Sequence, residues 1–151
     1  MKWNRLLLIP IVFAGLASIG GTGSDDDGSG TAKKSLTAIP ATTCPAASIS
    51  VSITIKATQT GGGDWVTTAT GSVTCTATTP ATPLAGVEVG INWPWNEQTT
   101  ATTDSAGNFT KASSKKAGQP SGAATAGVQP GPPAGSTTNP SPVTGTSNTL
   151  K

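Results

Sequence analysis

The sequence predicts an all-β fold, a small β-sandwich, on the strength of three observations. Thr is the commonest residue, with 27 copies among 151 residues, and the β-branched Thr side chain fits a pleated sheet better than a helix. Residues 48–57 alternate strictly between apolar and polar side chains, which is the period of a half-buried strand. Residues 65–78 and 87–93 repeat this alternation. These patterns favour several strands that share one core.

The first strand is predicted at residues 48–57. Its core face carries the apolar set Ile49, Val51, Ile53, Ile55 and Ala57. Residues 61–64, Gly-Gly-Gly-Asp, then break the alternation and allow the positive φ that a chain reversal requires. The second strand, residues 65–78, is therefore expected to run back alongside the first.

Two further strands are predicted after the turn-forming residues 80–83. In the third strand, one face carries Val87, Val89, Ile91 and Trp93. A short, polar fourth strand is expected at residues 99–103. Both follow the same rule of an apolar inner face and a polar outer face.

A turn at residues 103–109 is predicted to lead into a fifth strand. Asp104 can accept hydrogen bonds from backbone N–H groups of this turn, and Gly107 adopts the left-handed conformation at little cost. We therefore expect Asp104 to build the turn rather than to bind a ligand, and Phe109 to enter the core. Asn108-Phe109-Thr110 is the one N-glycosylation acceptor pattern of the sequence, and burial of Phe109 is expected to hide it.

Residues 1–23 have the pattern of a secretory signal peptide. A basic start precedes the apolar residues 6–16, and small residues follow from Ala17 onward. An uncleaved anchor is the alternative, but an apolar run of about 16 residues that contains Pro10 is shorter than the roughly 20 needed to span a bilayer. We expect an exported, extracellular or cell-surface protein, with membrane contact only through this segment if it stays uncleaved.

Cys44 and Cys75 are expected to form a disulfide, because an exported chain meets an oxidising environment. The bond would close a loop of about 30 residues and stabilise the fold by about 3.5 kcal/mol in the chain-entropy description. Two alternatives stay open. One is a metal site, which needs more ligands than two thiols in a chain without His, and the other is a buried pair of free thiols.

The composition argues against catalysis and against nucleic-acid binding. His is absent and charged side chains make up 11% of the chain, so the usual general acid or base is missing and the carboxylates are scattered. We expect no catalytic residue, no metal and no cofactor. Without Lys2 and Arg5 the chain has seven basic and seven acidic side chains, which offers nucleic acid no basic surface.

A pattern across residues 71–110 resembles a known group of domains. Its features are Gly71 at the opening of a strand, the run PLAGVEV at residues 83–89, and Thr103-Asp104 followed by Gly107 and Phe109. This pattern resembles the immunoglobulin-like and prealbumin-like domains of surface proteins, including the carboxypeptidase-regulatory-like group. The resemblance implies a β-sandwich that acts as a spacer, stalk or adhesion module. Antibody-type domains pair two Cys around a Trp, whereas no Cys follows Trp93 here.

Two segments are expected to lie outside the predicted domain, which spans residues 44–116. Residues 24–43 are polar and turn-rich and are interpreted as a linker. Residues 117–151 are rich in Gly, Pro, Ser and Thr and are interpreted as a disordered tail. A sandwich normally has about seven strands, so either residues 123–128 supply a poor edge strand or the open sheet accepts a strand from a partner.

Three tryptophans are the candidate binding residues. Trp95 follows a Pro at a strand end and is the better surface candidate, Trp93 has the parity of the core, and Trp65 beside the Gly-rich turn is undecided. We expect a structural or adhesion module without catalysis, whose partner is a surface protein or a glycan. A secreted carbohydrate- or protein-binding module is the alternative. A third hypothesis, an enzyme, would use the carboxylates Asp64, Glu88 or Asp104.

Overall fold

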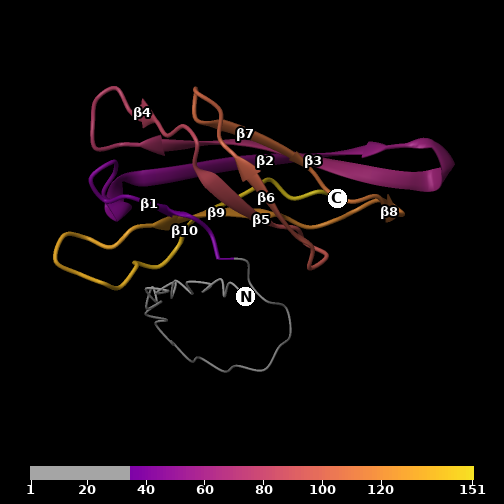
Figure 1. Ribbon diagram of the computed structural model, residues 1–151. Coiled ribbons are helices and arrows are strands. Elements are labelled where there is room, and N and C mark those ends of the chain that lie inside the picture. The colour runs from indigo at the N-terminus through magenta and orange to yellow at the C-terminus, as the bar shows by residue number, and fades with distance from the viewer. Residues whose placement is uncertain (1–34) are drawn as a thin grey trace, which may run out of the picture. The chain divides into compact units, whose positions relative to one another are not determined.

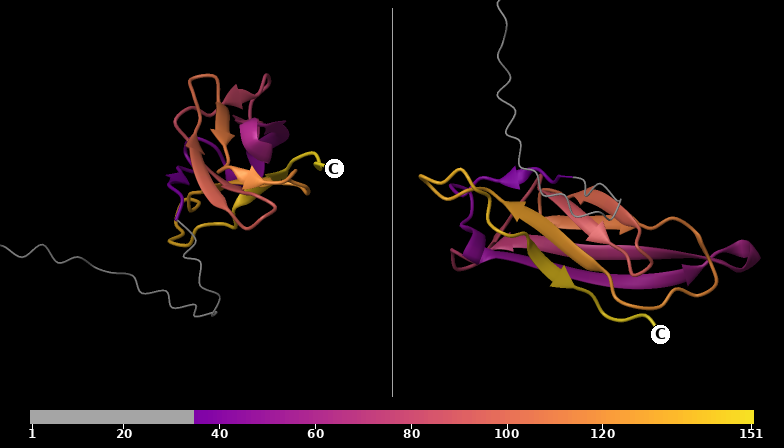
Figure 2. Two further views of the ribbon diagram at one scale, coloured as in Figure 1. Left: turned by 90° about the vertical axis from the view of Figure 1, so that its right-hand side faces the viewer. Right: turned by 90° about the horizontal axis from the view of Figure 1, so that it is seen from below.

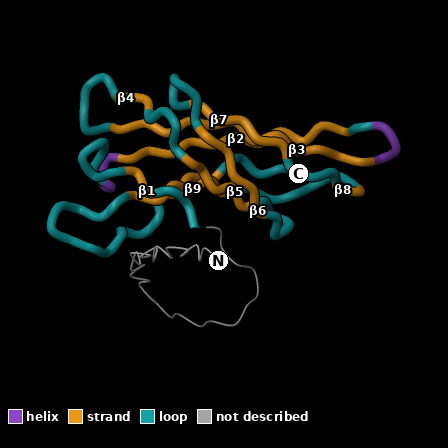
Figure 3. Tube along the Cα trace, in the orientation of Figure 1, coloured by secondary structure: helices purple, strands orange, loops and turns teal. Residues whose placement is uncertain are grey.

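The computed structural model describes residues 35–151, in which short strands form two β-sheets (Figures 1 and 2). The strands are β1 (Ala38–Ile39), β2 (Ile49–Gln59), β3 (Asp64–Cys75), β4 (Thr82–Pro83), β5 (Glu88–Asn92), β6 (Gln98–Thr102), β7 (Asn108–Ala112), β8 (Lys116–Ala117), β9 (Thr125–Pro130) and β10 (Val143–Thr146). Two 3-10 turns, η1 (Ala46–Ser48) and η2 (Gly61–Gly63), are the helical segments drawn in Figure 3.

The two sheets enclose one core, which confirms the all-β sandwich class. One sheet has the order β1-β9-β5-β6, with β10 also on β9, and the other has the order β2-β3-β4, with β7 and β8 also on β3. The predicted signal peptide, residues 1–23, lies outside the described residues. Within residues 35–151 the structure contains no helix that is both long and apolar enough to cross a membrane.

The strands β2 and β3 form a long antiparallel hairpin, because both sequences alternate over their whole length. Their register runs from Ile49 opposite Cys75 to Gln59 opposite Trp65, and the hairpin extends well beyond the other strands in Figure 1. The reversal at η2 uses Gly62 and Gly63, both with φ of 85°. The predicted first strand is confirmed, while the second ends at Cys75 rather than at Thr78.

The predicted turn between the fourth and fifth strands is also confirmed. The Oδ1 atom of Asp104 accepts hydrogen bonds from the backbone N–H groups of Ala106 and Asn108, both at 2.9 Å. Gly107 has a φ of 74°. Phe109 is buried, and it lies so close to Gly71 that a Cβ atom there would meet the Phe109 ring at 2.5 Å. Gly71 thus makes room for the ring.

The expected disorder of residues 117–151 is wrong. β9 lies inside its sheet, with Ile91 of β5 opposite Ala126 and Val143 of β10 opposite Val128. Ala126 and Val128 are fully buried. The strand is therefore not the poor edge strand proposed for residues 123–128, because other strands bond to both of its edges. Its small Ala and Gly residues suit a close-packed interior as well as they suit a flexible tail.

The expected linker boundary is wrong as well. β1 pairs in parallel with β9, with Ala38 opposite Gln129, and Ile39 is buried in the core. All of the described residues, 35–151, belong to one compact unit, so the domain is longer at both ends than the predicted span of 44–116. The part of the predicted linker before residue 35 lies outside the described residues.

The C-terminal segment closes the sheet edge that the sequence left open. Gly145 of β10 packs against the carbonyl oxygen of Val51 so tightly that a Cβ atom would clash with it. Farther along β2, the side chain of Asn148 bonds to both backbone groups of Ile55. Chain segments about 90 residues apart therefore share this edge, and residues of the same chain occupy the place that the alternative of an open sheet left for a partner strand.

Candidate functional site

The tryptophans that the sequence singled out gather near the turn between β5 and β6. Trp93 follows β5 and is buried, with 3% of its surface exposed. Its indole N–H donates to the hydroxyl of Thr99 at 3.0 Å. A backbone hydrogen bond from Trp93 N–H to the carbonyl of Glu97, at 2.8 Å, closes the turn. Trp93 is therefore a core residue, as its parity predicts.

Trp95 lies on the outer side of this turn and is only partly buried. Its ring stacks on that of Trp93, with 5.5 Å between centroids and 13° between planes. The Nζ atom of Lys116 lies 5.7 Å from the centroid of the Trp95 ring, within the range of a cation–π contact. The stacked indole and the nearby ammonium group thus hold the Trp95 ring in one orientation.

The carboxylate of Glu97 holds this turn against the segment between β7 and β8. One oxygen accepts a hydrogen bond from the backbone N–H of Ser114 at 2.8 Å. The other accepts from the Ser114 hydroxyl and from the indole N–H of Trp95, the latter at 2.8 Å. The same oxygen lies 3.4 Å from Lys116 Nζ. Four donors therefore converge on one carboxylate.

The environment lowers the pKa of Glu97 to about 2 from an ordinary value of 4.5. Partial burial alone would raise this pKa, because it penalises the charged form. The hydrogen bonds from the Ser114 side chain and backbone, and then those from Trp95 and Lys116, outweigh that penalty. Glu97 is consequently ionised at any pH near neutrality and acts as an acceptor, not as a proton donor.

Trp65 is the second residue of β3, just after the turn of the β2–β3 hairpin. It stands opposite Lys116 in the antiparallel pair of β3 and β8. Directly opposed residues of such a pair carry their side chains on the same face of the sheet. Lys116 thus stands opposite Trp65 in the sheet and lies over the ring of Trp95, 30 positions further along the chain. Sequence reasoning missed Lys116 and Glu97, because neither stands out in its own segment.

Among the other carboxylates of residues 35–151, Glu88 and Asp104 have structural partners on separate elements. Glu88 accepts hydrogen bonds from the backbone N–H and the hydroxyl of Thr37, at 3.1 and 3.2 Å, and Asp104 holds its turn. Asp64 opens β3 next to the hairpin tip. Among residues 35–151, no group of three or more His, Cys, Asp or Glu side chains has the arrangement of a metal site.

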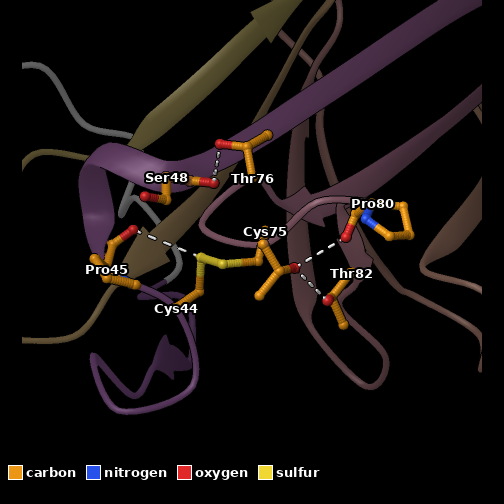
Figure 4. The surroundings of a disulfide bond; sticks show 8 residues. Cys44, Pro45, Ser48, Cys75, Thr76, Pro80 and Thr82 are labelled. Atoms are coloured by element: carbon orange, nitrogen blue, oxygen red, sulfur yellow. Dashed lines mark hydrogen bonds between the residues drawn. A yellow bond between two sulfur atoms is a disulfide. The ribbon is translucent and has the colours of Figure 1, made fainter.

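The predicted disulfide is confirmed between Cys44 and Cys75, with 5.8 Å between their Cα atoms (Figure 4). It joins the segment before β2 to the end of β3, and both residues are buried. Beside it, the backbone N–H of Thr76 and its hydroxyl both donate to the carbonyl of Ser48, at 2.7 and 3.0 Å. Since the described cysteines are both bonded, the free-thiol and metal alternatives fall away.

A groove of about 540 Å³ lies next to the disulfide, between β1 and the loop that leads into β5. Apolar side chains from both segments line it, among them Ile39, Pro83, Leu84 and Val87. The sequence did not predict this groove, because it assigned the β1 segment to a linker.

Comparison with profiles of known protein families, with curated proteins and with solved structures finds no match to this chain.

Proposed function

We propose that this chain is an exported, non-catalytic module with a structural or adhesive role at the cell surface or outside the cell. The buried Cys44–Cys75 disulfide is the observation that carries the proposal. Such bonds persist in oxidising compartments and are rare in the cytosol. The apolar N-terminal pattern of residues 6–16 points to the same compartment.

The polar groups around the tryptophans support a structural role and not a catalytic one. Glu97 is saturated by donors from Ser114, Trp95 and Lys116. Its low pKa removes it as a general acid near neutral pH. The cluster fixes the β5–β6 turn to the β7–β8 segment, as a rigid spacer or adhesion domain requires.

Cell fractionation with N-terminal sequencing of the recovered chain tests the proposal. Thiol labelling under denaturing conditions should be run on the same material. We expect a chain outside the cytosol that starts beyond its apolar N-terminal segment and whose two cysteines resist labelling. Recovery in the cytosol with Cys44 and Cys75 in the thiol form would refute the proposed location and, with it, the surface role.

A secreted carbohydrate- or protein-binding module is the second candidate, because Trp65 and Trp95 are both partly exposed. Lys116 pairs with Trp65 across the strands and lies over the Trp95 ring. Exposed aromatic side chains held in place suit stacking on a sugar ring or on a partner protein. A glycan and protein-array screen should compare the wild type with Trp95→Ala, Trp65→Ala and Trp95→Phe. Binding lost in both Ala variants and kept in the Phe variant supports this candidate, whereas unchanged binding in both Ala variants removes it.

A further inference from the structure

The acceptor pattern Asn108-Phe109-Thr110 is presented outward by β7. Side chains alternate between the two faces of a strand, so Asn108 and Thr110 point the same way and Phe109 points the other way. The structure bears this out, because Asn108 and Thr110 are exposed while Phe109 is 2% exposed. Burial of Phe109 was expected to hide the pattern, but it instead fixes both acceptor side chains toward solvent. The expectation that burial of Phe109 hides the pattern is therefore wrong.

The surroundings of Asn108 leave room for a bulky group. Its partner across the sheet is Ser72, and the partner of Thr110 is Thr70, so the side chains directly opposite the pattern are short. Among the described strands β7 pairs with β3 alone. The Asn108 side chain makes no hydrogen bond within residues 35–151 that would have to be broken. Its backbone N–H, in contrast, is held by Asp104.

The chain also contains a near match that serves as an internal control. Asn139-Pro140-Ser141 has the acceptor spacing but carries Pro in the middle position, which the acceptor pattern excludes. Asn139 is exposed in the loop between β9 and β10. Exposure is thus shared by the two asparagines, and only the one on β7 has the permitted sequence.

We propose that Asn108 is an N-glycosylation site, an inference that depends on the proposed export of the chain. The donor would be an oligosaccharide linked to a lipid diphosphate, acted on by a membrane-bound transferase. The carboxamide nitrogen of Asn108 attacks the anomeric carbon, and a C–N bond forms. The C–O bond to the diphosphate breaks with its electron pair leaving on the diphosphate, and the amide proton passes to a base of the transferase.

A glycan at this position would protect an exposed edge strand. Asn108 is the first residue of β7, and unpaired strand edges are templates for association with other chains. A hydrated sugar at the start of the edge blocks such pairing without disturbing the core, because the buried Phe109 faces the opposite side.

Mass spectrometry of the chain recovered from its own source tests the proposal. Treatment with a glycan-releasing amidase in heavy-oxygen water should convert Asn108, but not Asn139, to a labelled Asp. The modification should be lost in Asn108→Gln and in Thr110→Ala and retained in Thr110→Ser. A thermal melt of each variant shows whether it is folded. Loss of the modification in Asn108→Gln supports the proposal only when that variant still folds.

The location of the same material separates this proposal from the proposed function. An exported wild-type chain with unmodified Asn108 overturns the glycosylation site and leaves the surface role standing. An unmodified chain confined to the cytosol overturns both. Labelled Asp at Asn139 would show that the release is not selective for the acceptor pattern and would also count against the assignment to Asn108.

Discussion

The side-chain carboxamide of Asn148 bonds to the backbone of Ile55 in the way that the backbone of a neighbouring strand would. Its Oδ1 atom accepts a hydrogen bond from the Ile55 backbone N–H at 2.8 Å, and its Nδ2 atom donates to the Ile55 carbonyl at 3.1 Å. Both backbone groups point away from β3, toward the edge of the sheet. One side chain therefore satisfies a donor and an acceptor that would otherwise form part of an open strand edge.

Replacing Asn148 with Ala should destabilise the domain by about 1–3 kcal/mol, because two partly buried backbone groups lose their partners. Hydrogen exchange should show the effect locally, with loss of protection at the Ile55 amide. Asn139→Ala, in an exposed loop, is the matched control and should leave the free energy of unfolding unchanged. Equal protection of Ile55 in the wild type and in Asn148→Ala would contradict the role assigned to this amide.

Replacement of two buried threonines by Val should change the free energy of unfolding in opposite directions. The Thr67 hydroxyl has no hydrogen-bond partner among the described residues, so Thr67→Val should stabilise the fold by about 1 kcal/mol by removing a buried unpaired group. The Thr103 hydroxyl donates to the Leu84 carbonyl at 2.6 Å and accepts from the Val87 N–H at 2.9 Å. Thr103→Val should therefore cost about 1–3 kcal/mol.

Chemical denaturation of both Val variants measures these differences. The chemical change is the same in the two cases and both sites are buried, so each variant controls for the other. Destabilisation of similar size at both positions would show that the hydrogen bonds of Thr103 do not decide the outcome.

Replacing Gly71 with Ala should destabilise the sandwich by about 1–3 kcal/mol, the usual cost of overpacking. A Cβ atom there would collide with the Phe109 ring and with the Ser52 carbonyl oxygen. Gly61→Ala is the control, because nothing lies within 4 Å of its Cβ position. Thermal melts of both variants provide the measurement, and a Gly71→Ala domain as stable as Gly61→Ala would refute the packing argument.

Glu97 should make the stability of the domain depend on pH below neutrality. Its pKa in the folded state, about 2, lies below the ordinary 4.5. The unfolded chain therefore binds the proton first, and the stabilisation is complete above 4.5 and is lost as the pH falls toward 2. Glu97→Gln should flatten this part of the stability profile and should cost about 1–3 kcal/mol near neutral pH, since an amide oxygen accepts less strongly.

Denaturant titrations across this range of pH should compare the wild type with Glu97→Gln. Asp64→Asn removes one negative charge elsewhere and corrects for the general change in net charge. A wild-type profile that matches that of Glu97→Gln between pH 4.5 and 2 would show that the four donors do not stabilise the charged carboxylate.

Replacing both cysteines with Ser should lower the free energy of unfolding by about 2–5 kcal/mol. The bond joins residues 31 positions apart, so its removal enlarges the conformational freedom of the unfolded chain. Equilibrium unfolding of Cys44→Ser/Cys75→Ser, with and without reductant, is the measurement. Reductant should destabilise the wild type alone, and an unaltered transition in the double variant would mean that the core suffices without the bond.

The sequence predicts the strands whose side chains alternate between large apolar and polar types. Residues 49–57 and 87–93 have Ile, Val and Trp on one face, and both lie in the sandwich as expected. β9 was predicted only as a poor edge strand or as part of a disordered tail. Its inner face carries Ala126 and Val128, with Ala124 just before the strand, and the two alanines are too small to give a clear hydrophobic period. β1 was missed because two residues are too short to show any period.

The candidate site could be predicted only in part, for a related physical reason. Parity within the strand places Trp93 inside, and Pro94 at the strand end predicts that Trp95 lies nearer the surface; both signals are local. The partnership of Lys116 with Trp65 and Trp95 depends on β8 pairing with β3. Contacts between distant segments follow from topology, and the spacing of a single sequence does not encode them.

The parallel pairing of β1 with β9 has a consequence for the order in which the polypeptide matures. Ala38 finds its partner Gln129 only after some 90 intervening residues have emerged, and folds that depend on such distant pairings form slowly. The sheet that contains β9 therefore cannot form while only the earlier residues have been synthesised, because β1 and β5 still lack the strand that lies between them. On the proposed export route, with the amino end leading, the sheet built on β9 can assemble only after β9 has followed β1 across the membrane.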